Sequence, residues 1–419
     1  MSSLPTISKN VSKYFWEICR PNTLMPHDGT SPISFTIEGR EDQFTDVKNI
    51  QQVVVCRVRK LNQAGAKENL GANDTAIPYC GFLYTMFHDV EAHLRHKLLY
   101  RTYGYYDLMT YLQILTGVPT SIKNYQMSGA LWFKDQAGAH SVVQADAALN
   151  YGEYRRGLFA SGSATFEMQG KLMLDCFQTE RPIPNRMGID LYFYPNETKK
   201  CVLSGDPASR YVLEIMDMYL IVPRIIPKTS LLNQPSVIPY TKTECYRMNI
   251  SANSQSFGPR NVVTTDNLPR KCLIVLLTEA QMNGSTALNR QEFNPRNVNQ
   301  ILLQVNGEHL PVYEGYKPNW DTLTYGNLYN ALFTELGTPD AIDIRKEDFK
   351  GGFVIFAFNL DQRYTSSDQY PPKRSGAIDL TLNFRAAVAE NLVVLVFLES
   401  ERVYRISKNR EFVEEPAVK

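Results

Sequence analysis

The densest cluster of potential metal ligands in the sequence is HDVEAHLRH, which runs from His88 to His96. Its three histidines and two carboxylates could bind zinc, because imidazole nitrogen and carboxylate oxygen are common zinc ligands. In a strand, His88 and His96 would share a face while His93 would point away from it. In a helix, His93 and His96 would be neighbours while His88 would lie away from them. The sequence therefore favours an exposed or loop-facing polar strand here, and we predict no metal site.

Motifs for catalysis or phosphate binding do not occur at the required spacing. A cupin-type jelly-roll enzyme needs two closely spaced histidines, a glutamate and a distant third histidine, and His140 and His309 do not supply this pattern. The stretch from Gly162 to Lys171 has the wrong spacing for a phosphate-binding loop, and SGSATF lacks the closing glycine of a nucleophile elbow. We expect no catalytic residue, no cofactor-binding residue and no cofactor, and we predict that the protein is not an enzyme.

Two further groups could bind a partner through charge or stacking. Arg155 and Arg156 could contact an anion, but adjacent arginines are usually solvated or paired with nearby acids such as Glu153. Three tyrosines could form a binding platform, although we expect them to pack a helix against a sheet. These tyrosines are Tyr103, Tyr105 and Tyr106.

The composition is that of a globular protein rich in strands. The 419 residues are enough for two domains, and 43% are hydrophobic while 21% are charged. The 24 tyrosines and 20 phenylalanines favour strands over helical bundles. The 44 basic and 43 acidic residues give a formal charge of +1, whereas proteins that coat nucleic acid carry a basic excess. We therefore expect no direct sequence-specific binding to nucleic acid.

Targeting signals and cysteine usage indicate a reducing compartment. The first residues, MSSLPTISKNVSKYFWEIC, lack the sustained apolar core of a signal peptide. The longest apolar run, Leu392 to Leu398, is far shorter than the roughly 20 residues of a membrane-spanning helix, so no transmembrane segment is expected. The seven cysteines include no Cys-x-x-Cys pair, and we expect them to be buried free thiols.

Hydrophobic periodicity predicts many strands. Alternation with period two marks strands with one buried face in PISFTIEG, ATFEMQGKLMLD, GIDLYFYPN and GAIDLTLNFRA. Four runs are apolar on both faces and suit central strands: VVVCRV, LIVLL, FVIFAF and LVVLVFL.

Two predicted helices follow the same tripeptide, Thr-Tyr-Gly. In TYGYYDLMTYLQILTG, which begins at Thr102, apolar residues at i, i+3, i+4 and i+7 form one stripe that ends at Gly117. TYGNLYNALFTELG, which begins at Thr324, shows a similar stripe that ends at Gly337. A third helix is expected within SIKNYQMSGALWFKD.

The two halves of the chain share an order of short matches. Each half has His-Leu, then Thr-Tyr-Gly, then an apolar strand (KLMLDCF or GGFVIFAF), then Ile-Asp-Leu, and then a long apolar run. The Ile-Asp-Leu matches begin at Ile189 and Ile378. Thr102 precedes the first by 87 positions, whereas Thr324 precedes the second by 54. We interpret this order as a tandem duplication of one β-rich domain, with a large insertion in the first copy.

The predicted fold is all-β, with two tandem jelly-roll β-sandwiches and a few short helices in the connections. About eight strands per half, joined by long connections, fit a jelly roll better than a short-looped barrel. Four prolines in VPRIIPKTSLLNQPSVIP are expected to interrupt any regular element and mark the boundary. We predict an N-terminal arm at 1–29, jelly rolls at 30–228 and 229–407, and a C-terminal tail at 408–419. Two unrelated β-sandwiches are the alternative.

The sequence resembles the major capsid (hexon-type) proteins of Polinton/Maverick elements and the related adintoviruses, a double jelly-roll lineage. In the first half, the similar passages are TYGYYDLMTYLQILTG, YQMSGALWFKDQAG, YGEYRRGLFASG and EMQGKLMLDCFQTERPIPNRMGIDLYFYPN. In the second half, they are TYGNLYNALF, KGGFVIFAFNLDQ and SGAIDLTLNFRAAVAENLVVLVFLESERVYRI. The resemblance covers roughly residues 30–410, and the order of the passages is more specific than any one of them.

The resemblance implies a structural protein of a DNA virus or virus-like transposable element. It implies pseudo-hexagonal homotrimeric capsomers that assemble into an icosahedral shell, with a penton-type single jelly-roll protein and minor capsid proteins as further partners. It also implies location in the virion capsid, after assembly in the host cytoplasm or nucleus. The alternatives are a double jelly-roll carbohydrate-binding module and a glycan hydrolase. A hydrolase would need two carboxylates that meet in one cleft.

The N-terminal arm carries an apolar cluster, Tyr14, Phe15, Trp16 and Ile18, before a polar stretch. Such a cluster could dock onto a neighbouring subunit or the inner face of a capsid. It could equally pack onto its own domain.

Overall fold

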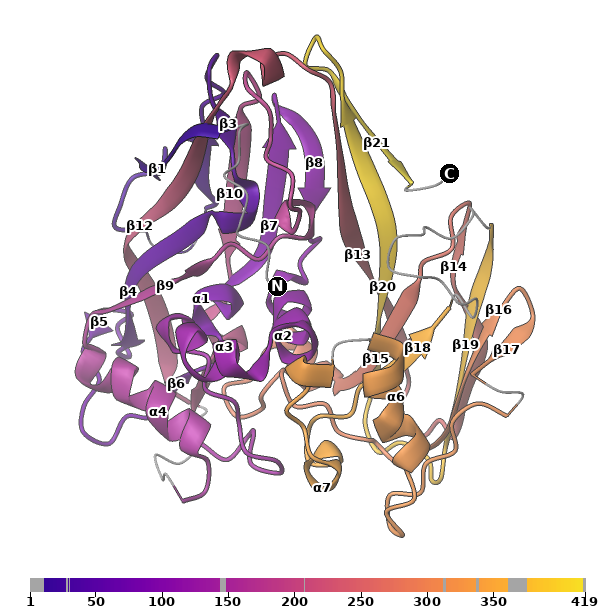
Figure 1. Ribbon diagram of the computed structural model, residues 1–419. Helices are drawn as coiled ribbons and strands as arrows, with labels where there is room; N and C mark the ends of the chain where they lie inside the picture. Colours follow the sequence, from indigo (N-terminus) through magenta and orange to yellow (C-terminus); the bar gives the residue numbers. More distant parts are fainter. Residues whose placement is uncertain are drawn as a thin grey trace, which may run out of the picture.

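The protein consists of two β-sandwiches that stand side by side (Figure 1). The computed structural model describes residues 11–27, 29, 31–143, 148–206, 208–311, 314–336, 339–360 and 375–416. Both sandwiches consist mainly of antiparallel strands, with short helices gathered at one end of the molecule.

The first sandwich contains two main sheets. In one sheet the order is β1-β12-β4-β5, while β9 also pairs with β4 and β3 with β12. In the other sheet the order is β2-β10-β7-β8, and a separate small ribbon joins β11 to β6. The strands are β1 (Val11–Cys19), β2 (Ile33–Ile37), β3 (Phe44–Thr45), β4 (Gln51–Leu61), β5 (Lys67–Glu68), β6 (Ala76–Pro78), β7 (Phe87–Leu94), β8 (Lys97–Arg101), β9 (Phe166–Lys171), β10 (Ile189–Pro195), β11 (Val202–Ser204) and β12 (Arg210–Pro227).

The second sandwich repeats this arrangement. One sheet has the order β13-β20-β15-β18, with β21 added to β20, and the other has the order β14-β19-β16-β17. The strands are β13 (Ser236–Ile250), β14 (Ser256–Thr265), β15 (Lys271–Thr278), β16 (Val298–Val305), β17 (Glu308–Leu310), β18 (Phe356–Asn359), β19 (Gly376–Phe384), β20 (Leu392–Ile406) and β21 (Phe412–Pro416).

Eight strands of each sandwich match in sequence order and in position. The set β1-β12-β4-β9 corresponds to β13-β20-β15-β18, and β2-β10-β7-β8 corresponds to β14-β19-β16-β17. Two four-stranded sheets with this crossing connectivity form a jelly roll. The prediction of two tandem jelly rolls is therefore confirmed, and the shared strand order supports the predicted duplication.

The helices lie mainly in the connections between the sheets. They are α1 (Phe82–Thr85), α2 (Tyr106–Gly117), α3 (Thr120–Asn124), α4 (Tyr151–Ala160), α5 (Glu279–Asn283), α6 (Gly326–Leu336) and α7 (Lys346–Phe349). Both helices predicted after Thr-Tyr-Gly are present. They occupy equivalent places, since α2 lies between β8 and β9 while α6 lies between β17 and β18. The predicted helix end at Gly337 lies outside the described residues. The additional helices α3 and α4 account for the longer connection in the first copy.

Several predicted boundaries were wrong. KLMLDCF is not one strand, because β9 ends at Lys171 and a short 3-10 helix covers Asp175–Phe177. The prolines of the boundary do not all interrupt regular structure, since Pro223 and Pro227 lie in β12 and Pro239 lies in β13. These prolines are tolerated because β4 pairs with β12 only as far as Ile221, and because β13 is an edge strand.

Both predicted terminal segments contribute strands. Val11–Cys19 of the predicted arm form β1, which pairs with β12 as the edge of the first sheet. Phe412–Pro416 of the predicted tail form β21, which pairs with β20. The boundary predicted between residues 228 and 229 falls in the short connection between β12 and β13.

The core lies between the two sheets of each sandwich and continues across the junction between the sandwiches. The predicted alternation is confirmed, because Ile33, Phe35 and Ile37 of β2 are all buried. All seven residues of LVVLVFL in β20 are buried too, as expected for a central strand packed on both faces. Among the described residues, we find no helix long and apolar enough to cross a membrane.

Candidate functional site: the junction between the jelly rolls

The histidines of HDVEAHLRH contact three separate partners. His88 Nδ1 lies 2.9 Å from the backbone oxygen of Pro195, and His93 Nε2 lies 3.2 Å from Glu91. His96 Nδ1 lies 2.8 Å from the carboxylate of Asp190. The segment forms β7 and the turn that follows it, so a strand is present as expected, but most of β7 is buried, and the expected exposure of this strand was wrong. Within the described parts of the chain, no cluster of three or more His, Cys, Asp or Glu side chains could hold a metal ion.

The remaining histidine and glycine candidates lie far apart in the fold. His140 is fully buried, and its ring packs edge-on against Phe353 at 4.6 Å between centroids. His309 lies in β17 of the second jelly roll, where its Nε2 contacts Gln304. Gly162 lies in the turn after α4, and Lys171 ends β9.

Arg155 and Arg156 have opposite environments, and the acid that pairs with Arg156 is Asp135 instead of Glu153. Arg156 is fully buried and donates to the carbonyl of Pro78 at 2.7 Å and to the Asp135 carboxylate at 2.6 Å. The guanidinium of Arg155 lies over the ring of Phe133 at 5.4 Å. The segment forms α4, in which successive residues point to different sides. One arginine therefore enters the core while the next covers an aromatic surface.

The three neighbouring tyrosines, Tyr103, Tyr105 and Tyr106, also differ in their burial. Tyr106, the first residue of α2, is buried, and Tyr105 is partly buried against the core, as expected for packing. Tyr103 is exposed, contrary to expectation, because its φ of +51° belongs to a left-handed turn that directs it outward. Its ring lies 5.6 Å from the guanidinium of Arg101.

A buried ion pair joins the two jelly rolls. Arg290 lies in the second jelly roll, and its Nη1 is 2.5 Å from Oδ2 of Asp107 in α2 of the first. Both side chains are only 4% exposed. Burial raises the pKa of Asp107, although the charge of Arg290 and the donor Asn196 oppose that effect. A charge buried this deeply is stable only with its partner, so the pair fixes the relative position of the two sandwiches.

Two further buried polar groups cross the same junction. Asn289 donates to the Asp135 carboxylate at 3.3 Å and to the carbonyl of His140 at 3.0 Å. Lys123 of α3 is fully buried and donates to Asp343 at 2.9 Å and to the carbonyl of Ala341 at 2.5 Å. The helical insertion of the first copy is therefore tied to the second sandwich by charge-assisted hydrogen bonds.

Side chains of the first jelly roll form hydrogen bonds with the backbone of the edge strand β13. The backbone N–H of Thr243 donates to Asp175 at 2.6 Å, and the backbone oxygen of Thr243 accepts from Tyr100 at 3.5 Å. Farther along, the backbone oxygen of Val237 accepts from Arg181 at 2.7 Å. An unpaired strand edge can associate with other chains, and here the neighbouring sandwich occupies it.

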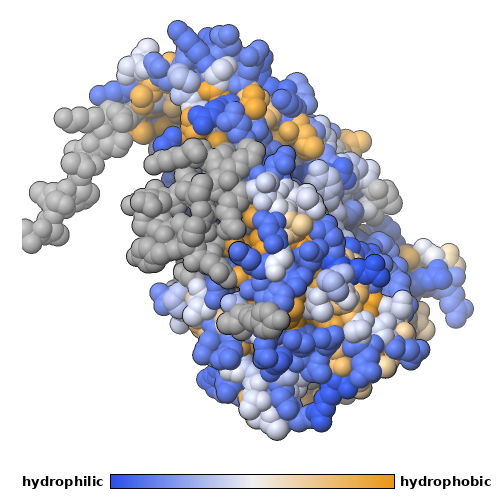
Figure 2. Space-filling model, turned by 90° about the vertical axis from the view of Figure 1, so that its right-hand side faces the viewer, coloured by the Kyte–Doolittle hydropathy of each residue, from blue (hydrophilic) through white to orange (hydrophobic). Residues whose placement is uncertain are grey.

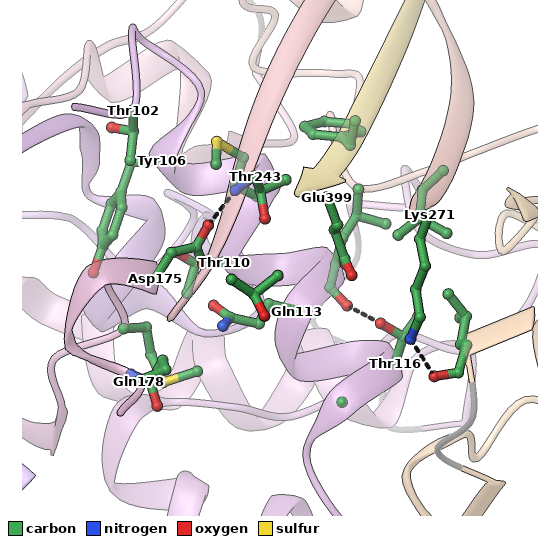
Figure 3. A pocket seen from close by; sticks show the side chains of 18 of the residues that line it. Thr102, Tyr106, Thr110, Gln113, Thr116, Asp175, Gln178, Thr243, Lys271 and Glu399 are labelled. Atoms are coloured by element: carbon green, nitrogen blue, oxygen red, sulfur yellow. Dashed lines mark hydrogen bonds between the residues drawn. The ribbon is translucent and has the colours of Figure 1, made fainter. Parts of the chain in front are cut away.

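A cavity of about 260 Å³ lies along this junction (Figure 3). The first jelly roll contributes Tyr100, α2 and Asp175, while the second contributes β13, Lys271 and Glu399. Burial raises the pKa values of both Asp175 and Glu399. Lys271 donates to the backbone oxygen of Leu336 at 2.6 Å. Asp175 and Lys271 are thus engaged in structural hydrogen bonds. This arrangement is more typical of a packing interface between two domains than of a reaction centre.

On the opposite side of the first jelly roll, β1 exposes an apolar face. Tyr14, Trp16 and Ile18 alternate along the strand and are 45%, 48% and 60% exposed. The rings of Tyr14 and Trp16 pack edge to face at 5.8 Å, and Tyr14 donates to Asp46 at 3.1 Å. A row of large apolar side chains on one exposed face is typical of an interaction surface.

Sequence comparison finds one distant full-length relative. The uncharacterized protein F54H12.2 of Caenorhabditis elegans is 22% identical over 412 residues, which cover 92% of this chain and 93% of that protein. No protein-family model matches the sequence.

Solved viral structures share the fold over nearly the whole chain. A chain of the Sputnik virophage structure, determined by cryo-electron microscopy, has a TM-score of 0.68 at 12% identity, covering 100% of this chain and 91% of that chain. The mavirus major capsid protein has a TM-score of 0.60 at 8% identity, with 100% and 92% coverage. The Faustovirus major capsid protein has a TM-score of 0.55 at 10% identity, with 96% and 92% coverage. The chain therefore has the double jelly-roll fold of these viral major capsid proteins.

Proposed function

We propose that the protein is a major capsid protein that forms pseudo-hexagonal homotrimers and assembles the icosahedral shell of a DNA virus or virus-like transposable element. The observation that carries the proposal is the full-length similarity to viral capsid proteins, since both jelly rolls and their connection are covered. Two similar sandwiches per chain suit this role, because three chains then present six similar walls to a hexagonal lattice.

The buried junction supports the same role. A capsomer needs its two sandwiches held rigidly, and the pair Asp107–Arg290 and the buried Lys123 join them through the core. The polar groups at the junction are used for packing, which supports a structural protein and not an enzyme. We further propose a lineage among Polinton/Maverick elements and adintoviruses, on the passages quoted above, and location in the virion capsid after assembly in the host cytoplasm or nucleus. A penton-type single jelly-roll protein and minor capsid proteins are the proposed partners.

Light scattering coupled to size-exclusion chromatography tests the proposed assembly. The chain has a mass of 47.7 kDa, so a trimer should scatter at about 143 kDa and assembled shells should elute in the void volume. A monomer at all protein concentrations and salt concentrations would contradict the proposal. Specific binding to a glycan array by such a monomer would favour the carbohydrate-binding alternative.

A further inference from the structure

The second jelly roll has an open groove where the first jelly roll has the junction cavity. The groove has a volume of about 900 Å³ and is lined by Pro311, which follows β17, and by much of α6. The junction cavity is lined by Tyr100 of β8 and by α2. In both sandwiches the lining helix is the one that follows the edge strand of the second sheet, β8 or β17.

Alignment of the two Thr-Tyr-Gly segments shows that the groove and the cavity are equivalent. Five lining positions of the cavity coincide with five lining positions of the groove. The equivalent pairs are Thr102 and Thr324, Tyr106 and Leu328, Met109 and Ala331, Leu112 and Thr334, and Gln113 and Glu335. The duplication has thus produced two copies of one site.

The two copies differ in what covers them. In the first, Thr241 and Thr243 of β13 complete the cavity wall. In the second, the lining residues all come from the second jelly roll itself, between Pro311 and Lys346. The helices reflect this difference, because Leu112 of α2 is buried while its equivalent Thr334 is exposed, as is Asn330 one turn earlier. Hydroxyl and amide groups at these positions can bond the backbone of a strand edge, as the hydroxyl of Tyr100 does in the first copy.

The strand equivalent to β13 is β1. Each is the first strand of its sandwich, lies at a sheet edge and pairs with the long final strand, β12 or β20. The outer edge of β13 is bonded by the first jelly roll. Within the described chain, the only backbone partner of β1 is β12, and Tyr14, Trp16 and Ile18 on one face of β1 are exposed. The chain thus carries one open edge strand, β1, and one open groove along α6. They are equivalent to β13 and to the cavity along α2, which meet at the junction between the jelly rolls.

We propose that β1 of one copy of this chain docks into the groove along α6 of a second copy. The contact between chains would then repeat the contact between the jelly rolls within a chain. Because β1 and β17 lie at opposite sides of the molecule, the contact is head to tail, and such contacts close into a ring when the rotation allows (Figure 1). This inference rests on the proposed trimer and identifies the surfaces that form it.

The receiving side of the molecule has a mixed surface suited to such a contact. Figure 2 views the molecule from the side where β17 lies, and hydrophobic patches appear there among hydrophilic side chains. Leu323, at the groove, is 46% exposed, which offers an apolar contact for the β1 side chains. Partly apolar surface with a polar rim is common at interfaces between protein subunits.

Site-specific photo-cross-linking of the full-length protein tests this docking. A benzophenone amino acid at position 16, in place of Trp16, should cross-link chains, and the modified partner peptide should contain Leu323–Asn330. The control carries the same group in place of Leu158 on α4, which is exposed to a similar extent, and should give at least ten-fold less cross-linking within trimers. Trimers whose cross-links from position 16 map elsewhere would overturn the docking alone. A protein that stays monomeric would overturn the proposed function and this inference together.

A charge introduced into the groove provides a second test. Asn330→Arg should raise the protein concentration needed for half-maximal trimer formation at least ten-fold, while circular dichroism shows an unchanged fold. Asn409→Arg is the matched control, because Asn409 is an exposed asparagine in the turn between β20 and β21. Trimer formation by Asn330→Arg that equals that of the control would overturn the docking.

Discussion

Asp107 of the first jelly roll and Arg290 of the second form an ion pair of 2.5 Å in which both side chains are 4% exposed. The pair lies where the two sandwiches share a continuous core, so its charges have little access to water. Such a pair contributes more to the relative position of the domains than to stability in itself, because desolvation offsets much of the attraction.

Breaking this pair should be costly. Arg290→Met leaves the Asp107 carboxylate buried without its cation, and we expect the free energy of unfolding to fall by about 3–5 kcal/mol. Denaturant titration followed by tryptophan fluorescence would measure the change. The control is Arg405→Met, which breaks the exposed pair with Glu415 and should cost less than about 1 kcal/mol. Equal effects of the two substitutions would contradict the role of the buried pair.

Glu153 should make stability depend on pH. Its side chain is fully buried, its oxygens have no hydrogen-bond partner among the described residues, and burial raises the pKa of its carboxyl to about 9. Asp135 and Glu292 act in the same direction as burial, while Arg156 opposes it. The unfolded chain releases this proton near the ordinary pKa of about 4.3, so stability should decline as pH rises between that value and about 9.

Glu153→Gln tests this dependence. The variant should match the parent near pH 4 and be more stable at pH 7, by at most about 4 kcal/mol. Thermal unfolding across this pH range would show it, with the exposed Glu167→Gln as the control. A parent and a Glu153→Gln variant with parallel stability curves would show that Glu153 is not held neutral in the folded state.

Asn150 should contribute strongly to the stability of the helical insertion. It is fully buried, accepts a hydrogen bond from the backbone of Glu153 at the start of α4, and donates to Asp135 and to the carbonyl of Ala139, both at 3.0 Å. Asn150→Ala removes the helix cap and leaves buried groups unpaired, so we expect a loss of about 2–4 kcal/mol. Asn299→Ala, at an exposed site in β16, should change stability by less than about 0.5 kcal/mol. A small effect at position 150 would contradict this assignment.

Truncation should separate the two parts of the N-terminal segment. Removal of residues 1–10 leaves every described strand in place, and we expect the protein to remain trimeric. Removal of residues 1–20 also removes β1, which exposes the edge of β12, and we expect aggregation or loss of trimers. Size-exclusion chromatography of both truncations would decide, and intact trimers after removal of residues 1–20 would show that β1 is dispensable.

Much of the architecture could be predicted because it depends on local periodicity. The alternation in Ile33–Ile37 and the repeated Thr-Tyr-Gly helices identified the strands and the duplication. Long-range pairing could not be predicted in this way. Arg156 pairs with Asp135, 21 positions away in a loop, and not with Glu153, which lies one turn away on the same helix. Likewise, the bond between Asp175 and the edge of β13 depends on how the sandwiches pack, which a single sequence does not reveal.

The most direct test of the central claim is electron microscopy of the purified protein at its main chromatographic peak. The proposed function predicts particles with a hexagonal outline and three-fold symmetry, in which each chain contributes two upright sandwiches, or closed shells built from such particles. Single two-lobed particles at every concentration tested would contradict it.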